Sequence, residues 1–253
     1  MRRTGFTQLL IASVIVSLLG SLALSSCGNT VSNNAYDYPL RPGMEGWRSL
    51  AGYTAMVSAC QIPQNTIEHM STMALVASIL DYPLMMDFWV HNLPQEGFDV
   101  IMGEFNGLQE LFKRDDAGTA LLEQYASMDL AAIDANWPDS QKVDYCFKIN
   151  TAEMIMSQPC ILSTMDQDEM HSIVNEAISK VEAKSASALC SKWDTQASAW
   201  LIGRTLEQAD YTPFVESIAQ DNNVRYFLTT GFGVDDINNI LAYAHQFVAV
   251  NET

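Results

Sequence analysis

Basic residues are scarce in this chain. It carries 13 lysines and arginines against 30 aspartates and glutamates, which gives a formal net charge of −17 at pH 7. The few cations form no cluster along the sequence. Because an acidic surface repels phosphate groups and anionic lipid headgroups, the sequence predicts no nucleic-acid partner and no membrane contact through surface charge.

Long apolar runs are also missing, apart from one near the start of the chain. Arg2 and Arg3 precede an uncharged apolar run of about 16 residues, at positions 9–24. A membrane-spanning helix needs about 20 such residues, so this run is short for that purpose. Two cations followed by a short apolar run are typical of a secretory signal.

The residues that follow this run make the signal more specific. Positions 24–27 read LSSC and resemble a bacterial lipobox, in which small residues precede a cysteine that is lipidated and becomes the new N-terminus. The alternative is an ordinary cleaved signal with an incidental cysteine nearby. Lipidation of Cys27 would attach several acyl chains, and multi-chain anchoring is stable where one chain is marginal. The sequence thus predicts an anchored lipoprotein of the bacterial cell envelope, either periplasmic or surface-exposed.

These features divide the chain into three parts. We expect a lipoprotein signal peptide at 1–26, a flexible tether at 27–45 and a single all-α domain at 46–250. Removal of the signal takes away two arginines and no acid, which leaves 227 residues with a formal charge of −19. A chain of that length is ample for one sizeable hydrophobic core.

Cysteines are few for an exported protein. Beyond Cys27 there are only four, namely Cys60, Cys146, Cys160 and Cys190. Four cysteines allow three pairings, and an exported chain meets an oxidising environment. Each of them lies in an apolar helical context, where free buried thiols are also common. Free thiols and one or two disulfides therefore remain open alternatives.

Recognisable catalytic motifs are absent from the sequence. It has no Gly-Xaa-Ser-Xaa-Gly turn, no phosphate-binding loop and no dinucleotide-binding glycine motif. A thiol enzyme would need a histidine within reach, and Cys60 with His69 or His171 is the conceivable pair. Asp81 and Asp87 flank the most apolar helices and could serve as paired carboxylates, although acids beside a proline break are more often caps or surface groups.

Metal-binding patterns are equally weak. Positions 166–171 read DQDEMH and form the only ligand-like cluster, but they lack the turn glycine and the distal glutamate of a calcium loop. Acids are expected there in any case, because they stabilise the first turn of a helix. The histidines show no helical i, i+4 pairing of the kind that binds zinc; they are His69, His91, His171 and His245. We therefore expect no metal and no cofactor.

What the sequence does contain is helical periodicity from residue 46 to residue 250. No strand alternation and no hairpin turn interrupts it, so it predicts an all-α fold of about ten short helices. An irregular orthogonal bundle and a short stack of the HEAT or armadillo kind both fit, although no repeat of fixed period is visible. The stretch from Met70 to Tyr125 is the most apolar and is expected to organise the core.

Several boundaries are predicted in detail. One helix should open at Gly46 and continue past Tyr53, with apolar residues at helical spacing. Ser71 or Thr72 should cap the next helix, which is apolar on most sides and should be covered all round. Three further features are expected from capping and breaker rules: Pro83 as a helix end, Asn106 with Gln109 as a capping pair, and Thr164 with Gln167 as a capping box.

Six short motifs resemble a block found in uncharacterised exported proteins of gut-associated Bacteroidetes and Firmicutes. The block covers residues 47–125, and residues 199–246 resemble the tail of the same proteins less closely. The motifs are ACQIP at 59–63, MST at 70–72, ALV at 74–76, LDYP at 80–83, FNGLQEL at 105–111 and DAG at 116–118. The resemblance implies a shared fold and secretion, and it transfers no catalytic residue.

Two hypotheses about function follow. The leading one is a lipid-anchored, non-catalytic envelope protein that uses a helical surface to bind a protein, a peptide or a glycan. The rival is an envelope hydrolase with Cys60 or an aspartate on the first helices as its catalytic group. A cleft that holds Cys60 and a histidine would favour the rival, and a closed core around Cys60 would count against it.

Overall fold

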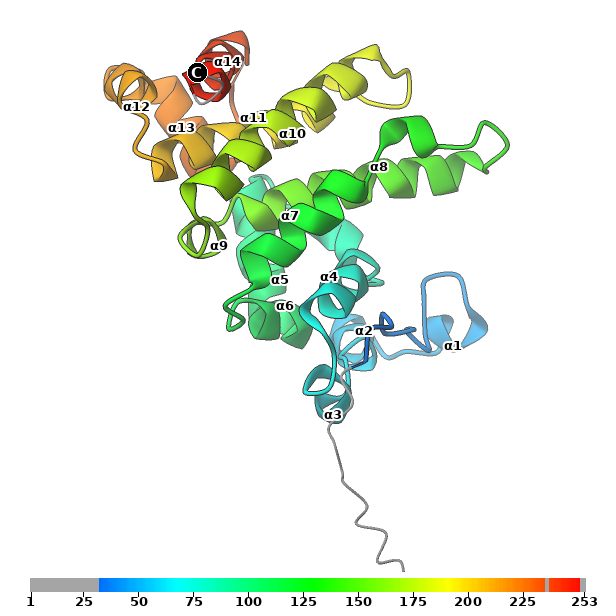
Figure 1. Cartoon of the computed structure of the whole chain (residues 1–253). Helices are drawn as coiled ribbons and strands as arrows, with labels where there is room; N and C mark the ends of the chain where they lie inside the picture. Colours follow the sequence, from blue (N-terminus) through cyan, green and yellow to red (C-terminus); the bar gives the residue numbers. More distant parts are fainter. Residues whose placement is uncertain (1–31, 235–236, 251–253) are drawn as a thin grey trace, which may run out of the picture. The chain divides into compact units, whose positions relative to one another are not determined.

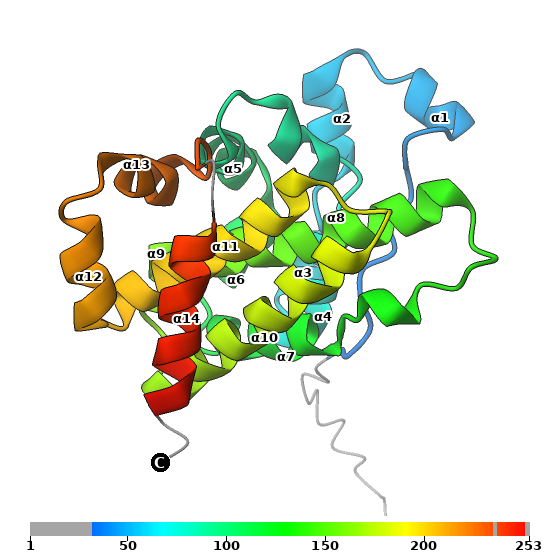
Figure 2. The same cartoon turned by 90° about the horizontal axis from the view of Figure 1, so that it is seen from above.

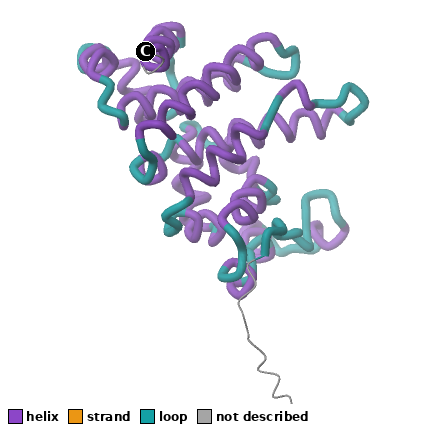
Figure 3. Tube along the Cα trace, in the orientation of Figure 1, coloured by secondary structure: helices purple, strands orange, loops and turns teal. Residues whose placement is uncertain are grey.

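The computed structural model describes residues 32–234 and 237–250 (Figure 1). Cys27 and the expected signal lie outside the described residues. Within the described ranges the chain consists of helices and loops (Figure 3), and the only β feature there is an isolated bridge between Ser32 and Met70. The prediction of an all-α fold of many short helices is confirmed.

The three longest helices, α8, α10 and α11, lie in the second half of the described chain. Those of the first half are α1 Glu45–Arg48, α2 Tyr53–Ala59, α3 Gln64–Ile67, α4 Thr72–Leu80, the 3-10 helix η1 Met85–Val90, α5 Pro94–Glu104, α6 Asn106–Leu111 and α7 Ala117–Ser127. After the 3-10 helix η2 Leu130–Ala132 come α8 Asp139–Met156, α9 Pro159–Leu162, α10 Gln167–Ala186, α11 Lys192–Gln208, α12 Thr212–Ile218, α13 Asn222–Thr230 and α14 Asn238–Val250.

Helix α4 begins and ends as the sequence predicts. The Ser71 hydroxyl accepts a hydrogen bond from the backbone N–H of Ala74 at 3.2 Å, which satisfies one of the free amides of the first turn. Seven of its nine residues are buried, in agreement with an apolar sequence on most sides. The helix stops at Leu80, shortly before Pro83.

The predicted long helix at Gly46 is instead two short helices. Gly52 interrupts it with a φ of +87°, a left-handed backbone conformation that glycine adopts without steric cost. This residue is the N-cap of α2, so the chain turns sharply between Arg48 and Tyr53. The helical spacing of apolar residues continues across the break, which is why periodicity alone did not reveal it.

The domain begins before Gly46, so the expected tether is shorter than 27–45. Tyr38 is 2 % exposed, and its hydroxyl donates to the backbone carbonyl of Ser78 at 3.0 Å. The backbone N–H of Tyr36 donates to the Ser78 hydroxyl at 2.7 Å. These contacts attach the segment before α1 to helix α4, and burial of the Tyr38 ring outweighs the polar, linker-like composition around it.

Two predicted capping pairs are wrong by a few residues. Asn106 is the first residue of α6 and not its cap; its side chain exchanges two hydrogen bonds with the backbone of Ile62, which ties α6 to the loop after α2. The capping box of α10 consists of Asp166 and Glu169 rather than Thr164 and Gln167. The carboxylate of Asp166 is the better acceptor for free amides at the positive end of a helix.

Helix α11 is the central element of the second half. It contacts α8, α9, α10, α12, α13 and α14. Figure 2 shows α14 lying across the α10–α11 pair. In a helical stack each helix pair contacts only its neighbours in sequence, whereas α11 is surrounded by helices from both sides of the sequence. The arrangement is therefore an irregular bundle.

Candidate functional site

A charged cluster lies in the interior between α7, α8, α10 and α11. Glu153 and Lys184 are both fully buried, and the Lys184 Nζ lies 2.6 Å from a carboxylate oxygen of Glu153. The other carboxylate oxygen accepts from the hydroxyls of Tyr125 at 2.8 Å and Ser198 at 2.7 Å. Lys184 also donates to the Ser198 hydroxyl and to the Asp194 carbonyl, both at 3.0 Å.

This cluster is a structural element. Every donor of the ammonium group and both oxygens of the carboxylate have partners, and a buried ion pair is tolerated only when its hydrogen bonds are complete. Burial and the neighbouring Glu153 carboxylate raise the pKa of the Tyr125 hydroxyl well above its ordinary value, so this hydroxyl remains a donor. With no exposed atom at its centre, the cluster offers nothing to a substrate.

The carboxylate of Asp81 belongs to a second ionic group, in the surface cavity beside α4. It pairs with Arg41 and with Lys148, whose Nζ lies 3.0 Å away. Partial burial alone would raise the pKa of Asp81, but hydrogen bonds and charges from these two cations outweigh it and lower the pKa. A carboxylate held ionised between two cations is a poor general acid. It joins the N-terminal segment to α8.

Cys60 lies in a closed core. The residue is 0 % exposed, and burial raises the pKa of its thiol to about 11, so the nucleophilic thiolate is scarce at neutral pH. Neither of the expected partner histidines bonds to it within the described part of the chain: His69 bonds to the carbonyl of Asn65, and His171 packs against the ring of Phe247. This environment does not favour a catalytic thiol.

Asp87 lies in η1 near Tyr53 and Glu104. Partial burial raises its pKa, while a hydrogen bond with the Tyr53 hydroxyl lowers it in part. The Tyr53 hydroxyl also donates to Glu104 at 2.9 Å at an exposed position. Asp81 pairs with Arg41 and Lys148, whereas Asp87 lies beside Tyr53 and Glu104, so the structure does not bring the two aspartates together as a carboxylate pair.

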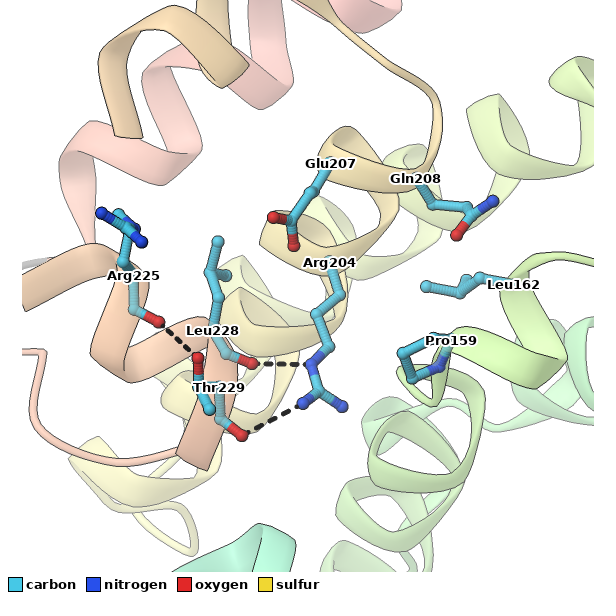
Figure 4. Close-up of a pocket in the computed structure, with 8 residues that line it drawn as sticks. All are labelled: Pro159, Leu162, Arg204, Glu207, Gln208, Arg225, Leu228 and Thr229. Carbon is cyan, nitrogen blue, oxygen red and sulfur yellow. Dashed lines mark hydrogen bonds between the residues drawn. The ribbon is translucent and has the colours of Figure 1, made fainter. Parts of the chain in front are cut away.

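A cavity of about 430 Å³ lies between α9, α11 and α13 (Figure 4). Its most notable lining residue is Arg204, whose guanidinium points at the end of α13. It donates to the backbone carbonyls of Leu228 at 2.7 Å, Thr229 at 3.2 Å and Ser157 at 3.2 Å. It also lies over the ring of Trp200, 4.3 Å from its centroid.

These partners explain why Arg204 carries no carboxylate partner within ion-pair distance in the described residues. The three carbonyls belong to the C-terminal ends of α8 and α13, where helix dipoles concentrate partial negative charge. Burial lowers the pKa of Arg204 to about 10, so it remains charged at neutral pH. Arg204 therefore holds two helix ends against α11, and these contacts occupy its guanidinium group.

A third region has the properties of a ligand site, and we call it the aromatic cleft. Two neighbouring cavities of about 260 and 270 Å³ share Trp89 and Trp193 among their lining residues. Trp193 at the start of α11 is 58 % exposed and is stacked on Phe232, with ring centroids 5.3 Å apart and an interplanar angle of 14°. The buried Trp200 lines the same cleft about two helical turns further along α11.

Polar atoms at the walls of the aromatic cleft lack partners. Asn150 and Gln196 are 4 % and 5 % exposed, and each uses its amide nitrogen in a hydrogen bond, to Asp194 and to the carbonyl of Val234. Their amide oxygens, and the indole N–H of Trp89, are buried without a partner among the described residues. A buried polar atom left unpaired costs about 1–3 kcal/mol, and three such atoms around one cleft indicate a site adapted to further hydrogen bonds.

The one acidic side chain that lines the aromatic cleft already has hydrogen-bond partners within the protein. Asp194 lines one cavity, but its two oxygens accept from Asn150 and from the backbone and hydroxyl of Ser191. No lysine or arginine is among the residues that line either cavity. The cleft can thus offer flat aromatic faces and hydrogen-bonding groups, and His91 is the only basic side chain that lines it.

Most of the cleft could not be identified from the sequence. It combines residues 89–94, the start of α8, residues 189–200 and residues 231–232. One sequence signal was present: Trp193, Gln196, Ala197 and Trp200 recur at helical spacing and share one face of α11.

The described residues show neither a metal-binding cluster nor a membrane-spanning helix. No group of three His, Cys, Asp or Glu side chains is placed to hold a metal ion in residues 32–234 and 237–250. Asp166 and Glu169 of the expected ligand-like cluster form the cap of α10. Over the same ranges, no helix has the length and apolar character needed to cross a bilayer.

Comparison with known proteins gives no match. No protein-family model matches the chain, and neither a curated protein nor a solved structure is similar to it. The resemblance to exported proteins of gut-associated bacteria therefore stays a prediction.

Proposed function

We propose that this chain is a lipid-anchored, non-catalytic protein of the bacterial cell envelope that binds a neutral saccharide in the aromatic cleft. The observation that supports the proposal is the combination at that cleft of an exposed aromatic stack, Trp193 on Phe232, with unpaired buried polar atoms. The anchor rests on the lipobox-like residues before Cys27.

A saccharide fits the chemistry of this cleft. The faces of a sugar ring carry C–H groups with slight positive charge, which pack on the negative face of an aromatic ring. Its hydroxyls can both donate and accept, which suits walls that hold two amide oxygens and one indole N–H buried just beneath their surface without partners. Small-ligand sites are commonly built in this way, from aromatic side chains with a few polar groups that fix orientation.

The charge of the cleft argues for a neutral ligand. An acidic sugar or a phosphorylated ligand would meet no lysine or arginine in either cavity, only His91, and the chain as a whole is strongly acidic. A basic peptide would gain from the overall charge, but Asp194, the one acid in the cleft, already uses both oxygens. An uncharged sugar avoids both costs.

The other cavities give weaker support for a binding role. The guanidinium of Arg204 is committed to helix ends, and Asp81 is committed to Arg41 and Lys148. The rival hydrolase hypothesis needs an accessible nucleophile, and Cys60 is 0 % exposed with a raised pKa.

The binding test uses the full chain and a panel of neutral hexasaccharides, namely those of glucose in α-1,4 and β-1,4 linkage, of xylose, of mannose and of N-acetylglucosamine. We expect the wild-type protein to bind at least one of them by isothermal titration calorimetry, and Trp193→Ala to weaken that binding at least tenfold. Trp137→Ala, which removes a tryptophan packed edge to face against Tyr145 outside the cleft, is the matched control. Failure to bind any member of the panel, or binding only of a basic peptide such as hexalysine, would overturn the proposal.

The anchor is tested separately. Intact-mass analysis of the protein extracted from membranes should give residues 27–253 plus acyl chains, and Cys27→Ser should move the protein to the soluble fraction. An unacylated product cleaved at another position would contradict the anchor without bearing on the cleft.

A further inference from the structure

Two of the cysteines lie next to each other in space. Cys146 is a buried residue of α8, and Cys190 is a half-buried residue of the loop between α10 and α11. Their sulfur atoms are 3.8 Å apart, although the residues are 44 positions apart in the sequence. The bonded distance in a disulfide is about 2.05 Å, so the sulfurs need to approach by less than 2 Å for a bond to form.

The other described cysteines have no such partner. Cys60 is buried in the core beside α4, and Cys160 is exposed on α9. Neither makes a sulfur–sulfur contact in the described part of the chain. Of the six possible pairs among these four cysteines, the geometry therefore selects Cys146 with Cys190 and leaves Cys60 and Cys160 as free thiols.

We propose that Cys146 and Cys190 form a disulfide bond when the exported protein meets a disulfide donor, such as oxidised glutathione or an envelope thiol–disulfide oxidoreductase. This inference does not depend on the ligand of the aromatic cleft. It rests on the contact between the two sulfurs and on the difference in access between them.

The difference in access gives the order of the steps. Burial and the neighbouring Cys190 raise the pKa of the Cys146 thiol to about 12, so the half-buried Cys190 is the thiol that reacts first. Its thiolate attacks one sulfur of the donor disulfide and releases the other as a thiolate. Cys146 then loses its proton and attacks the Cys190 sulfur, which releases the second donor thiolate. The two protein thiols lose two electrons, and the donor ends as two thiols that carry both protons.

The bond would fasten one wall of the aromatic cleft. Cys146 lines the same cavity as Leu189, Ser191 and Trp193, and Cys190 lies between the first two of these in the chain. A covalent link to α8 would fix the start of α11 and the loop before it. It would also close a long loop in the unfolded chain, which stabilises the folded state.

The direct test is a thiol map of the full chain. The protein is fully reduced, equilibrated with oxidised glutathione, unfolded and alkylated with iodoacetamide, then digested and analysed by mass spectrometry. We expect one peptide pair joined through Cys146 and Cys190, with Cys60 and Cys160 alkylated. Alkyl groups or glutathione on Cys146 and Cys190, or a bond from either to another cysteine, would overturn the proposal.

Thermal unfolding provides a second readout. Oxidation should raise the Tm of the wild-type protein and of the control Cys160→Ser by roughly 5–15 °C. It should leave the Tm of Cys190→Ser unchanged. An equal rise in Cys190→Ser would show that oxidation acts elsewhere and would contradict the proposed pair.

Discussion

Helix α11 carries two groups of side chains that differ in how completely their polar atoms are hydrogen-bonded. On one face, Ser198 joins the buried cluster of Glu153 and Lys184, in which every charged atom has its partners. On another, Trp193 and Gln196 line the aromatic cleft, where a large ring is exposed and an amide oxygen is unpaired. Saturated hydrogen bonding in the interior indicates a structural role, whereas the unsatisfied groups beside the open aromatic surface are the basis of the binding role that we propose.

The largest loss of stability is expected when one half of the buried ion pair is removed. Lys184→Met should lower the free energy of unfolding by about 3–5 kcal/mol, because it leaves the Glu153 carboxylate buried without a counter-charge. Urea unfolding monitored by circular dichroism measures this.

Lys142→Met is the matched control, because Lys142 pairs with an Asp139 carboxylate whose side chain is 93 % exposed. Its effect should stay below about 1 kcal/mol. Similar losses of unfolding free energy in the two variants would show that the buried ion pair contributes no more to stability than the exposed one.

A smaller effect is expected at the edge of the same cluster. Tyr125→Phe removes one hydroxyl that donates to Glu153 and keeps the ring, so the loss should be about 1.5–3 kcal/mol, as for hydrogen bonds to charged groups. The control is Tyr226→Phe, whose ring is half exposed and should change the unfolding free energy by no more than about 0.5 kcal/mol. An unchanged midpoint for Tyr125→Phe would contradict a saturated carboxylate.

The ionic group around Asp81 should give a still smaller effect that depends on pH. The pKa of Asp81 is lowered in the folded protein, so its contribution is present above its ordinary pKa of about 3.9 and is lost as the pH falls through the folded value. Because the side chain is 36 % exposed, solvent screening limits the contribution to about 1 kcal/mol.

Asp81→Asn should therefore be less stable than the wild-type protein at pH 7, and the difference should shrink below about pH 4. The equivalent change at Asp37, whose side chain is 97 % exposed, should have no measurable effect. A difference for Asp81→Asn that is the same at every pH would contradict the ionic origin.

Some of the features behind these predictions could be predicted from the sequence, and others could not. Helix α4 was predictable, because its apolar residues cover most of its circumference and Ser71 is a preferred cap. The stretch from Met70 to Tyr125 is well buried as expected. The central helix of the second half, however, is α11, whose sequence KWDTQASAWLIGRTLEQ is mixed in character.

The reason is that burial of polar residues depends on partners elsewhere in the chain. Thr195, Gln196, Ser198 and Thr205 are buried in α11 because hydrogen bonds satisfy most of their polar atoms. Lys184 and Glu153 look like surface residues in sequence, since charged side chains are seldom buried unless paired. Their pairing joins two residues that are 31 positions apart in the sequence, and no local pattern encodes it.

The smallest stability effect is expected in the aromatic cleft. Trp193→Ala removes a ring that is 58 % exposed, so the unfolding free energy should change by about 0.5 kcal/mol or less. Trp200→Ala is the matched opposite on the same helix, because that ring is 2 % exposed and its loss should cost about 3–5 kcal/mol. Equal losses would remove the contrast between a binding and a structural tryptophan.

The most direct test of the cleft is NMR of the indole N–H signals while the bound hexasaccharide is titrated into the full chain. The chain has five tryptophans, of which Trp89, Trp193 and Trp200 line the cleft while Trp47 and Trp137 do not. We predict that the signals of Trp89 and Trp193 shift in proportion to bound ligand and that those of Trp47 and Trp137 stay in place. Shifts confined to Trp47 and Trp137 would contradict the assignment of the aromatic cleft as the binding site.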